Sequence, residues 1–322
     1  MMMRKMLFTI VAASLAASTA IAAPTQEPLT AQGPAGTLAG TLIRPADGQP
    51  VILVIPGSGP TDRDGNNPLG VTAAPYRLLA EALGARGIGT LRIDKRGMFG
   101  SAAPGVDPNA VTIERYADDV AAWADAARKA TGRDCIWLLG HSEGGLVALA
   151  AARRMPGLCG AITVAAPGRK LGDVMREQLR ANPANAPLLD AALAAIARLE
   201  AGERVDVSAM PAPLQGLFAP PVQGFLIDLF GHDPAALAAG VTVPLLVIQG
   251  GNDLQVAEAD GETLRAAQRQ ARYALLPDMN HVLKDVPGKD RSANLAAYGD
   301  PSRPVSPGLV DAIAGFVSPG AQ

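Results

Sequence analysis

The chain has 322 residues, and its 28 Lys and Arg against 30 Asp and Glu give a formal charge of −2. Apolar residues make up 48% of the sequence and charged residues 18%, so the chain can bury a large core and is not disordered as a whole. With no long run of Lys or Arg and a pI near 6.0, it lacks the basic footprint that nucleic-acid binding needs. These values favour an enzyme that acts on a small molecule.

The first 22 residues have the layout of a secretory signal peptide. Arg4 and Lys5 precede an apolar run, and the small residues Ala20 and Ala22 suit cleavage after Ala22. No other stretch approaches ~18 uninterrupted apolar residues, so we expect no membrane contact after cleavage. The expected destination is the periplasm, with secretion as the alternative.

Strands alternate with helices over residues 23–166, the predicted first part of the core. The run 51–55 is apolar on both faces, which is typical of a buried parallel strand. The alternation predicts right-handed βαβ crossovers and a mostly parallel sheet with helices on both faces. The predicted strands are 40–44, 51–55, 89–93, 135–139 and 161–165, and the predicted helices are 76–86, 112–130 and 143–154.

Residues 167–240 interrupt this alternation and predict an inserted helical cap. Helical spacing at 171–181 and 188–201 precedes a Pro-rich section. The alternation resumes in 241–322, the predicted second part of the core. Its elements are the strands 243–249 and 272–276 and the helices 257–270 and 307–317.

The two cysteines are expected to form a disulfide, because disulfides persist in exported proteins. Neither belongs to a CxxC pair or to a cluster with metal-ligand spacing. Cys135 begins one predicted strand and Cys159 stands just before the next. Consecutive parallel strands tend to lie side by side, about 4.8 Å apart, which is within the reach of a disulfide. Two small buried hydrophobic residues are the alternative.

A G-x-S-x-G sequence at residues 140–144 suggests a nucleophile. It falls where a predicted strand meets a predicted helix, and Gly140 and Gly144 remove the side chains that would crowd a sharp turn. Such a turn exposes Ser142. A serine that only caps the helix is the alternative.

A serine nucleophile needs a base, usually a histidine that an acid orients. Of the 3 histidines, His281 follows the last predicted core strand and is the candidate base, whereas His141 lies inside the turn and His232 in the cap. The acid is expected after a core strand between serine and base. Asp253 has that position and is the candidate acid.

Other acids are weaker candidates for this role. Asp278 is the second choice, but it lies so near His281 that it is expected to shape the turn. Asp228 and Asp233 belong to the cap. The chain order is then Ser, Asp, His.

The tetrahedral intermediate of acyl transfer needs rigid N–H donors, an oxyanion hole. We expect one donor from Glu143, the first residue of the helix after Ser142. The second is expected from Ser58, in a Gly- and Pro-rich loop that follows a core strand. The Glu143 side chain is interpreted as a favourable charge at a helix N-terminus.

These features resemble the α/β-hydrolase superfamily over residues 38–318. More narrowly, four blocks resemble a bacterial group of short-acyl carboxylesterases that are often labelled by similarity to serine aminopeptidases. The resemblance implies an α/β-hydrolase fold and the same assignment of Ser142, Asp253 and His281. The blocks are GSGPTDRDGN at 57–66, DKRG at 94–97, GHSEGG at 140–145 and NHVLK at 280–284.

Two details of these blocks bear on the pocket. Met98 and Phe99 are bulkier than the residue usual after that Arg-Gly, which is a departure from the group. The run TDRD at 61–64 is expected either to line the pocket or to pair its charges within its own loop.

The expected function is hydrolysis of small uncharged esters through an acyl-enzyme, with short acyl chains preferred under the cap. A serine aminopeptidase is the second candidate and would need an acidic cluster, for which Glu143, Asp228 and Glu200 are available. A non-catalytic binding protein is the third, and a Ser in place of an Asp nucleophile excludes haloalkane dehalogenation. We expect no cofactor, no metal and no partner beyond the ester. The sequence does not indicate an oligomeric state.

Overall fold

The structure, a computed structural model, describes residues 24–318 and is built around an eight-stranded sheet. The strand order is β1-β2-β4-β3-β5-β6-β7-β8. β2 pairs antiparallel with both β1 and β4, and the other neighbouring strands are parallel. The strands are β1 (Gln26–Gly33), β2 (Gly36–Ile43), β3 (Val51–Ile55), β4 (Gly89–Ile93), β5 (Ile136–His141), β6 (Leu158–Val164), β7 (Leu245–Gly250) and β8 (Arg272–Leu276).

The antiparallel edge of the sheet differs from the sequence-based expectation. Only a strand at 40–44 is predicted there, whereas the structure has a hairpin of β1 and β2. Pro28 weakens the strand signal of β1, but an edge strand tolerates a proline because one of its sides needs no ladder hydrogen bond. The predicted signal peptide lies outside the described residues. None of the described helices has the length and apolar character needed to span a membrane.

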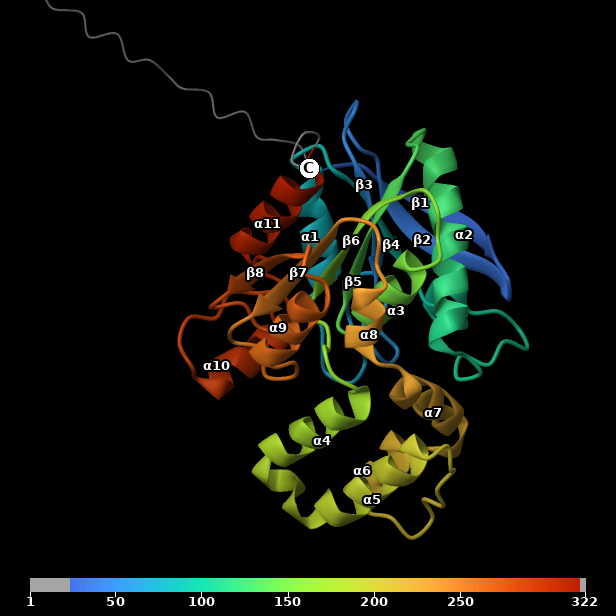
Figure 1. The fold of residues 1–322 in the computed structure, drawn as a ribbon, viewed down its shortest axis with the longest axis vertical. Coiled ribbons are helices and arrows are strands. Elements are labelled where there is room, and N and C mark those ends of the chain that lie inside the picture. The colour runs from blue at the N-terminus through green and yellow to red at the C-terminus, as the bar shows by residue number, and fades with distance from the viewer. Residues whose placement is uncertain (1–23, 319–322) are drawn as a thin grey trace, which may run out of the picture.

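Helices cover both faces of the sheet (Figure 1). The side chains of β3 alternate between two apolar cores, because successive residues of a strand point to opposite faces. Leu53 and Ile55 belong to the core under α2 (Ile113–Thr131) and α3 (Glu143–Ala152). Ile52 and Val54 belong to the core under α1 (Pro75–Gly84) and α11 (Pro307–Val317). The expected mostly parallel sheet between two helical layers is confirmed.

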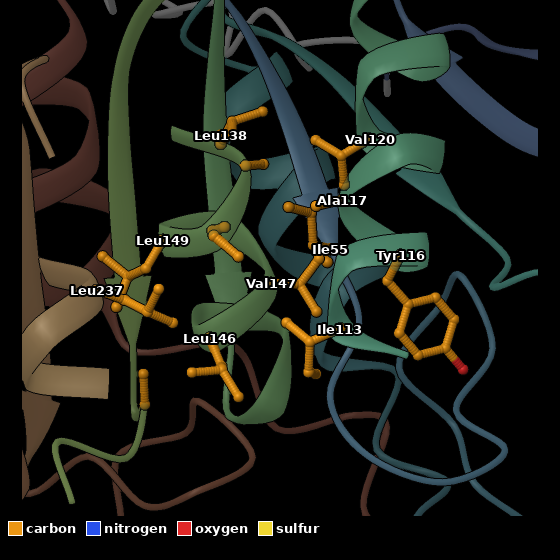
Figure 2. Packing of buried hydrophobic residues seen from close by; sticks show 14 of the residues in the cluster. Ile55, Ile113, Tyr116, Ala117, Val120, Leu138, Leu146, Val147, Leu149 and Leu237 are labelled. Carbon is orange, nitrogen blue, oxygen red and sulfur yellow. The ribbon is translucent and has the colours of Figure 1, made fainter. Parts of the chain in front are cut away.

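The core under α2 and α3 sets the position of the nucleophile turn. Figure 2 shows Val120 of α2, Val147 of α3 and Ile55 of β3 meeting on this face of the sheet. The helix α2 begins as the sequence predicts, since the Thr112 side chain accepts a hydrogen bond from the Arg115 N–H, 3.1 Å away. Packing of α3 in this core holds the residues at its start rigidly.

The segment between β6 and β7 is helical. Figure 1 shows α4 to α7 as a layer beyond one end of the sheet, whereas α8 returns to the core. One polar contact joins this layer to α2: the Asp228 carboxylate accepts a hydrogen bond from the Ile113 N–H, 2.8 Å away. The helices are α4 (Leu171–Ala181), α5 (Leu189–Glu200), α6 (Ala212–Leu217), α7 (Gln223–Gly231) and α8 (Pro234–Ala239). After β7 come α9 (Glu258–Ala267) and α10 (Arg291–Ala296).

Cys135 and Cys159 form a disulfide, with their Cα atoms 5.2 Å apart. Cys135 directly precedes β5, and Cys159 lies inside β6, which begins earlier than the predicted strand 161–165. Since β5 and β6 are parallel neighbours, the bond lies at their amino ends. Ser142 follows the carboxyl end of β5, at the opposite edge of the sheet.

Candidate active site

Ser142 lies at the sharp turn between β5 and α3. Its φ of 54° and ψ of −125° belong to neither the helical nor the extended region, so the backbone is strained at this residue. The Ser142 N–H donates to the carbonyl of Val164, 3.0 Å away, which ties the turn to β6. This is the conformation of a nucleophile elbow, in which the serine side chain projects from the end of the strand.

The glycines on either side of Ser142 are required by close backbone packing. A Cβ at Gly140 would lie 2.1 Å from the Gly144 carbonyl oxygen, and a Cβ at Gly144 would lie 2.3 Å from the Ile55 carbonyl oxygen. Both contacts are with main-chain atoms, which cannot rotate away. The turn therefore accepts only glycine at these two positions.

Asp253 and His281 are hydrogen-bonded to each other. His281 Nδ1 donates to Asp253 Oδ2, 2.8 Å away, and the Asp253 side chain is fully buried. Asp253 Oδ1 accepts from the N–H groups of Gln255 and Val256, at 2.7 and 3.0 Å. The carboxylate is thus fixed by its own loop after β7, and it orients the imidazole of His281 through Nδ1.

Ser142 and His281 line the same cavity. Within the described residues 24–318, no hydrogen bond joins the Ser142 hydroxyl to His281. Such bonds are often long in a site without substrate and shorten when a substrate is bound. The loops after β5, β7 and β8 bring the three predicted residues to one edge of the sheet, as expected for the carboxyl ends of parallel strands.

His141 is buried beneath this site and is held by two hydrogen bonds. Its Nε2 lies 2.8 Å from the backbone carbonyl of His281 and its Nδ1 lies 2.7 Å from the Tyr76 hydroxyl. Because a carbonyl can only accept, Nε2 carries the proton and Nδ1 accepts from Tyr76. Burial, together with the neighbouring His281, lowers the pKa of His141 to about 3. His141 is therefore a neutral structural group.

The remaining candidates from the sequence have other contacts. His232 Nε2 lies 3.4 Å from Asp228, its neighbour on α7. Asp278 is exposed, and its carbonyl accepts a hydrogen bond from the Val286 N–H, 2.8 Å away, within the loop after β8. Asp233 caps α8 by accepting from the N–H of Ala236. None of these three side chains has a contact to Ser142 within the described chain.

The two residues predicted to supply oxyanion N–H groups, Ser58 and Glu143, lie beside Ser142. Glu143 is the first residue of α3, so its N–H has no partner within the helix. Ser58 lines the same cavity as Ser142 and Glu143. A Cβ at Gly57 would lie 3.3 Å from the Ser142 Cβ, which places the loop after β3 directly against the elbow.

The Glu143 side chain has a partner that the sequence did not reveal. It is buried, and its carboxylate lies 3.6 Å from the ammonium group of buried Lys95. Burial raises the pKa of Glu143 and lowers that of Lys95, and the charge of each partner opposes the shift of the other. The macrodipole interpretation of Glu143 is therefore incomplete. The position of Lys95 directly after a core strand is the sequence signal that could have indicated this ion pair.

Of the two roles expected for the run at 61–64, lining of the pocket is found at Thr61, whereas Arg63 and Asp64 form ion pairs outside their own loop. Arg63 pairs with Asp94 and Asp64 pairs with Arg92, and both partners are buried residues in or just after β4. These ion pairs fix the loop after β3 against the edge of the sheet.

The cavity at Ser142 has two lobes, and Ser58, Ser142 and Gln255 line both. The cap lobe has a volume of about 110 Å³, and apolar side chains from the helical segment 167–240 form part of its lining. The loop lobe has a volume of about 100 Å³. The cap lobe includes Leu171, Val174, Met175 and Leu229, and the loop lobe includes Thr61, Asn67, Tyr76 and Tyr298. In the described part of the chain, no group of three or more His, Cys, Asp or Glu side chains is placed to bind a metal ion.

A family model and a curated relative match parts of the chain. The family model described as serine aminopeptidase, S33 (Hydrolase_4) matches residues 69–208, which include Ser142 but neither Asp253 nor His281. Esterase EstD of Thermotoga maritima is 28% identical over 247 residues, or 74% of this chain. The match covers 56% of EstD, so the chain spans little more than half the length of that relative.

Solved structures share the fold. The α/β-hydrolase GrgF from Penicillium sp. sh18 superposes with a TM-score of 0.56 and 18% identity, over 80% of this chain and 91% of that one. A hydrolase from Pseudomonas aeruginosa superposes with a TM-score of 0.55 and 20% identity, over 91% and 98% of the two chains. The strand order and these similarities show that the chain has the α/β-hydrolase fold.

Proposed function

We propose that the protein is a serine hydrolase that cleaves small, uncharged carboxylic esters. The observation that carries this proposal is the hydrogen bond between Asp253 and His281 on a cavity that the elbow residue Ser142 also lines. The similarity to EstD, a relative named as an esterase, agrees with it.

In the proposed reaction, His281 Nε2 accepts the Ser142 hydroxyl proton as the serine oxygen attacks the ester carbonyl carbon. The oxyanion of the tetrahedral intermediate accepts hydrogen bonds from the N–H groups of Ser58 and Glu143. The intermediate collapses as His281 returns the proton to the leaving alcohol, which leaves an acyl group on Ser142. A water molecule then repeats these steps and releases the acid. Asp253 accepts the hydrogen bond from the His281 Nδ1–H throughout and so keeps the imidazole in orientation.

The size and lining of the cavity support small substrates. Ordinary ligand pockets have volumes of about 300–1,000 Å³, whereas each lobe here has about 100 Å³. The carboxylate of Glu143, the one acidic side chain on the cap lobe, is already paired with Lys95. In the proposed complex the short acyl chain packs against Leu171, Val174 and Met175 in the cap lobe, and the alcohol part lies in the loop lobe.

The aminopeptidase alternative needs free acidic groups that converge on a substrate amino terminus. Each of the three acids considered for this role already has a different partner. Glu143 binds Lys95, Asp228 accepts from the Ile113 N–H, and Glu200 pairs with Arg176. These contacts favour an ester substrate over a peptide with a charged amino terminus.

We further propose that residues 1–22 are a signal peptide and that the protein is exported, most simply to the periplasm. The disulfide between Cys135 and Cys159 supports an oxidising compartment. Fractionation of cells that express the full chain, with the amino terminus of the product sequenced, tests the cleavage after Ala22. A cytoplasmic product that retains Met1 contradicts it.

The reaction is tested with p-nitrophenyl esters of graded acyl length beside amino-acyl p-nitroanilides. We expect turnover of the acetyl and butyryl esters and none of the anilides. Ser142→Ala should lower kcat by about a millionfold, the usual cost of losing a nucleophile of this kind. Ser208→Ala, an exposed serine of the cap, is the matched control and should keep wild-type activity. A Ser142→Ala variant with a tenth of wild-type activity rejects the mechanism.

A further inference from the structure

We propose that Lys95 is a positioning residue that fixes the peptide unit between Gly57 and Ser58, so that the Ser58 N–H is held toward the oxyanion. This inference rests on the proposed function, because it assigns to Lys95 a part in the same reaction. Lys95 itself touches no substrate in this proposal. It acts through the backbone of the loop after β3.

Both backbone polar groups of Gly57 are bound by buried side chains. The Lys95 ammonium donates to the Gly57 carbonyl, 2.8 Å away. On the other side of the residue, the Gly57 N–H donates to the Tyr76 hydroxyl, 3.0 Å away. A glycine has no side chain to restrain it, so these two hydrogen bonds hold a backbone position that is otherwise free to rotate.

The Gly57 carbonyl and the Ser58 N–H belong to one planar peptide unit. In a trans peptide they point in opposite directions, so a donor that fixes the carbonyl on one side also fixes the N–H on the other. The positive charge of Lys95 also polarises this peptide, which strengthens the Ser58 N–H as a donor. Ser58 lines both lobes of the cavity together with Ser142, which is the side on which the oxyanion forms.

Lys95 also connects the two proposed N–H donors. Its ammonium group lies 3.6 Å from the carboxylate of Glu143, whose own N–H is the second donor. It further lies 5.4 Å from the centre of the Tyr116 ring on α2. One cation thus contacts the loop after β3, the start of α3 and the face of α2. Because Lys95 contacts both segments, it sets the spacing between the N–H groups of Ser58 and Glu143.

Stability alone gives little reason for a lysine at this position. Taking two charges out of water is costly, and apolar replacements of buried ion pairs are often neutral or stabilising. Lys95 and Glu143 are 7% and 4% exposed. A hydrogen bond to the backbone of the oxyanion loop gives this costly arrangement a functional reason.

The next residue in the sequence supplies a matched control. Arg96 forms an equally buried ion pair with Asp119 on α2, with Nε 2.6 Å from the carboxylate. Arg96 also donates to the Arg115 carbonyl on α2. None of the hydrogen bonds of Arg96 in the described structure reaches the loop after β3. Loss of this pair therefore affects stability without displacing the Gly57–Ser58 peptide.

The test compares the double variants Lys95→Met/Glu143→Gln and Arg96→Met/Asp119→Asn, which remove the same kinds of charge in pairs. The single variants Lys95→Met and Glu143→Gln separate the backbone hydrogen bond from the ion pair. Each variant is assayed for kcat and KM on p-nitrophenyl acetate well below its melting temperature. Each is also titrated with a small trifluoromethyl ketone, which adds to Ser142 as a tetrahedral oxyanion, and with the matching methyl ketone.

We expect kcat of Lys95→Met, and of its double variant, to fall about tenfold to a hundredfold, somewhat less than the loss of an entire oxyanion donor. KM and the methyl ketone affinity should stay within about twofold, whereas the trifluoromethyl ketone affinity should fall by the same factor as kcat. Glu143→Gln keeps the Lys95 hydrogen bond to Gly57 and should lose less than about fivefold in kcat.

Three outcomes overturn the inference. One is a kcat within about twofold of wild type in the Lys95 double variant, and another is a loss confined to KM. The third is an equal loss of kcat in the Arg96 double variant, which indicates a general effect of buried charge. Failure of the proposed function is recognised separately, because the wild type would then hydrolyse no ester and Ser142→Ala would change nothing.

Discussion

His141 donates a hydrogen bond from Nε2 to the backbone carbonyl of His281, 2.8 Å away. The bond joins the turn that carries Ser142 to the loop that carries the proposed base. Tyr76 extends the connection, since its hydroxyl donates to Nδ1 of His141 and accepts from the Gly57 N–H. The loops after β3, β5 and β8 are therefore linked through one neutral imidazole.

This link predicts a loss of stability in acid. The pKa of His141 is about 3 in the folded protein, because of burial and the nearby His281, whereas a histidine in an unfolded chain titrates near 6.5. Between these values the unfolded chain binds a proton that the folded chain does not. The stabilisation by His141 is thus fully present above about pH 6.5 and is lost as the pH falls, by a few kcal/mol near pH 3.

Urea unfolding of the wild type and of His141→Gln at several pH values between 4 and 7 measures this effect. The free energy of unfolding of the wild type should fall more steeply toward low pH than that of the variant, because glutamine does not titrate. Parallel pH dependences for the two proteins would show that His141 does not supply the acid sensitivity.

The choice of base is tested by two histidine variants. His281→Ala should reduce kcat about as much as the loss of Ser142, since the members of such a set act as a unit. His232 contacts Asp228 in the cap, so His232→Ala should change KM more than kcat. Steady-state kinetics on p-nitrophenyl acetate distinguish the two. Near-wild-type kcat in His281→Ala, with a large loss in His232→Ala, would exchange their roles.

The small cap lobe predicts a preference for short acyl chains. A smaller side chain at one of its lining residues should weaken this preference. Leu171 of α4 lines this lobe, so Leu171→Ala should enlarge it and raise kcat/KM for longer acyl esters relative to acetate. Leu217→Ala, an exposed leucine on α6 of the same cap, is the matched control and should leave the acyl profile unchanged. A wild type that hydrolyses dodecanoyl esters faster than butyryl esters would show an open groove instead.

Local signals in the sequence predict much of the sheet and its helices. The helix N-cap residue Thr112 marks the start of α2, and the β-branched run 51–55 coincides with β3. Position after a core strand also selects Asp253 and His281 over other acids and histidines, because parallel strands bring their carboxyl ends to one edge. This reasoning needs only strand order and spacing.

The contacts that the sequence does not predict are those between distant segments of the chain. The carboxylate of Glu143 pairs with Lys95, which is 48 residues away in the sequence. The position of Glu143 at the start of a helix predicts its interaction with the helix but not this ion pair. Tyr76 belongs to α1, and its contacts with Gly57 and His141 arise only when that helix packs on the sheet. Periodicity identifies such residues as core and says nothing of their hydrogen bonds.

The disulfide provides a test of stability that is separate from catalysis. Cys135 and Cys159 are 24 residues apart and join the amino ends of β5 and β6. Closing a loop of this length stabilises the folded chain by about 3 kcal/mol in the chain-entropy model. Ser142 lies at the other end of β5, so the bond has no direct contact with the site.

Reduction, or the double variant Cys135→Ser/Cys159→Ser, should therefore lower the melting temperature by several degrees and leave kcat on p-nitrophenyl acetate unchanged at room temperature. Thermal unfolding with and without reductant measures the first effect, and the double variant should show no further response to reductant. Titration of thiols in the unfolded, non-reduced protein is the direct check. Two free thiols would show that the bond does not form, and a large loss of kcat on reduction would show that the two edges of the sheet are coupled.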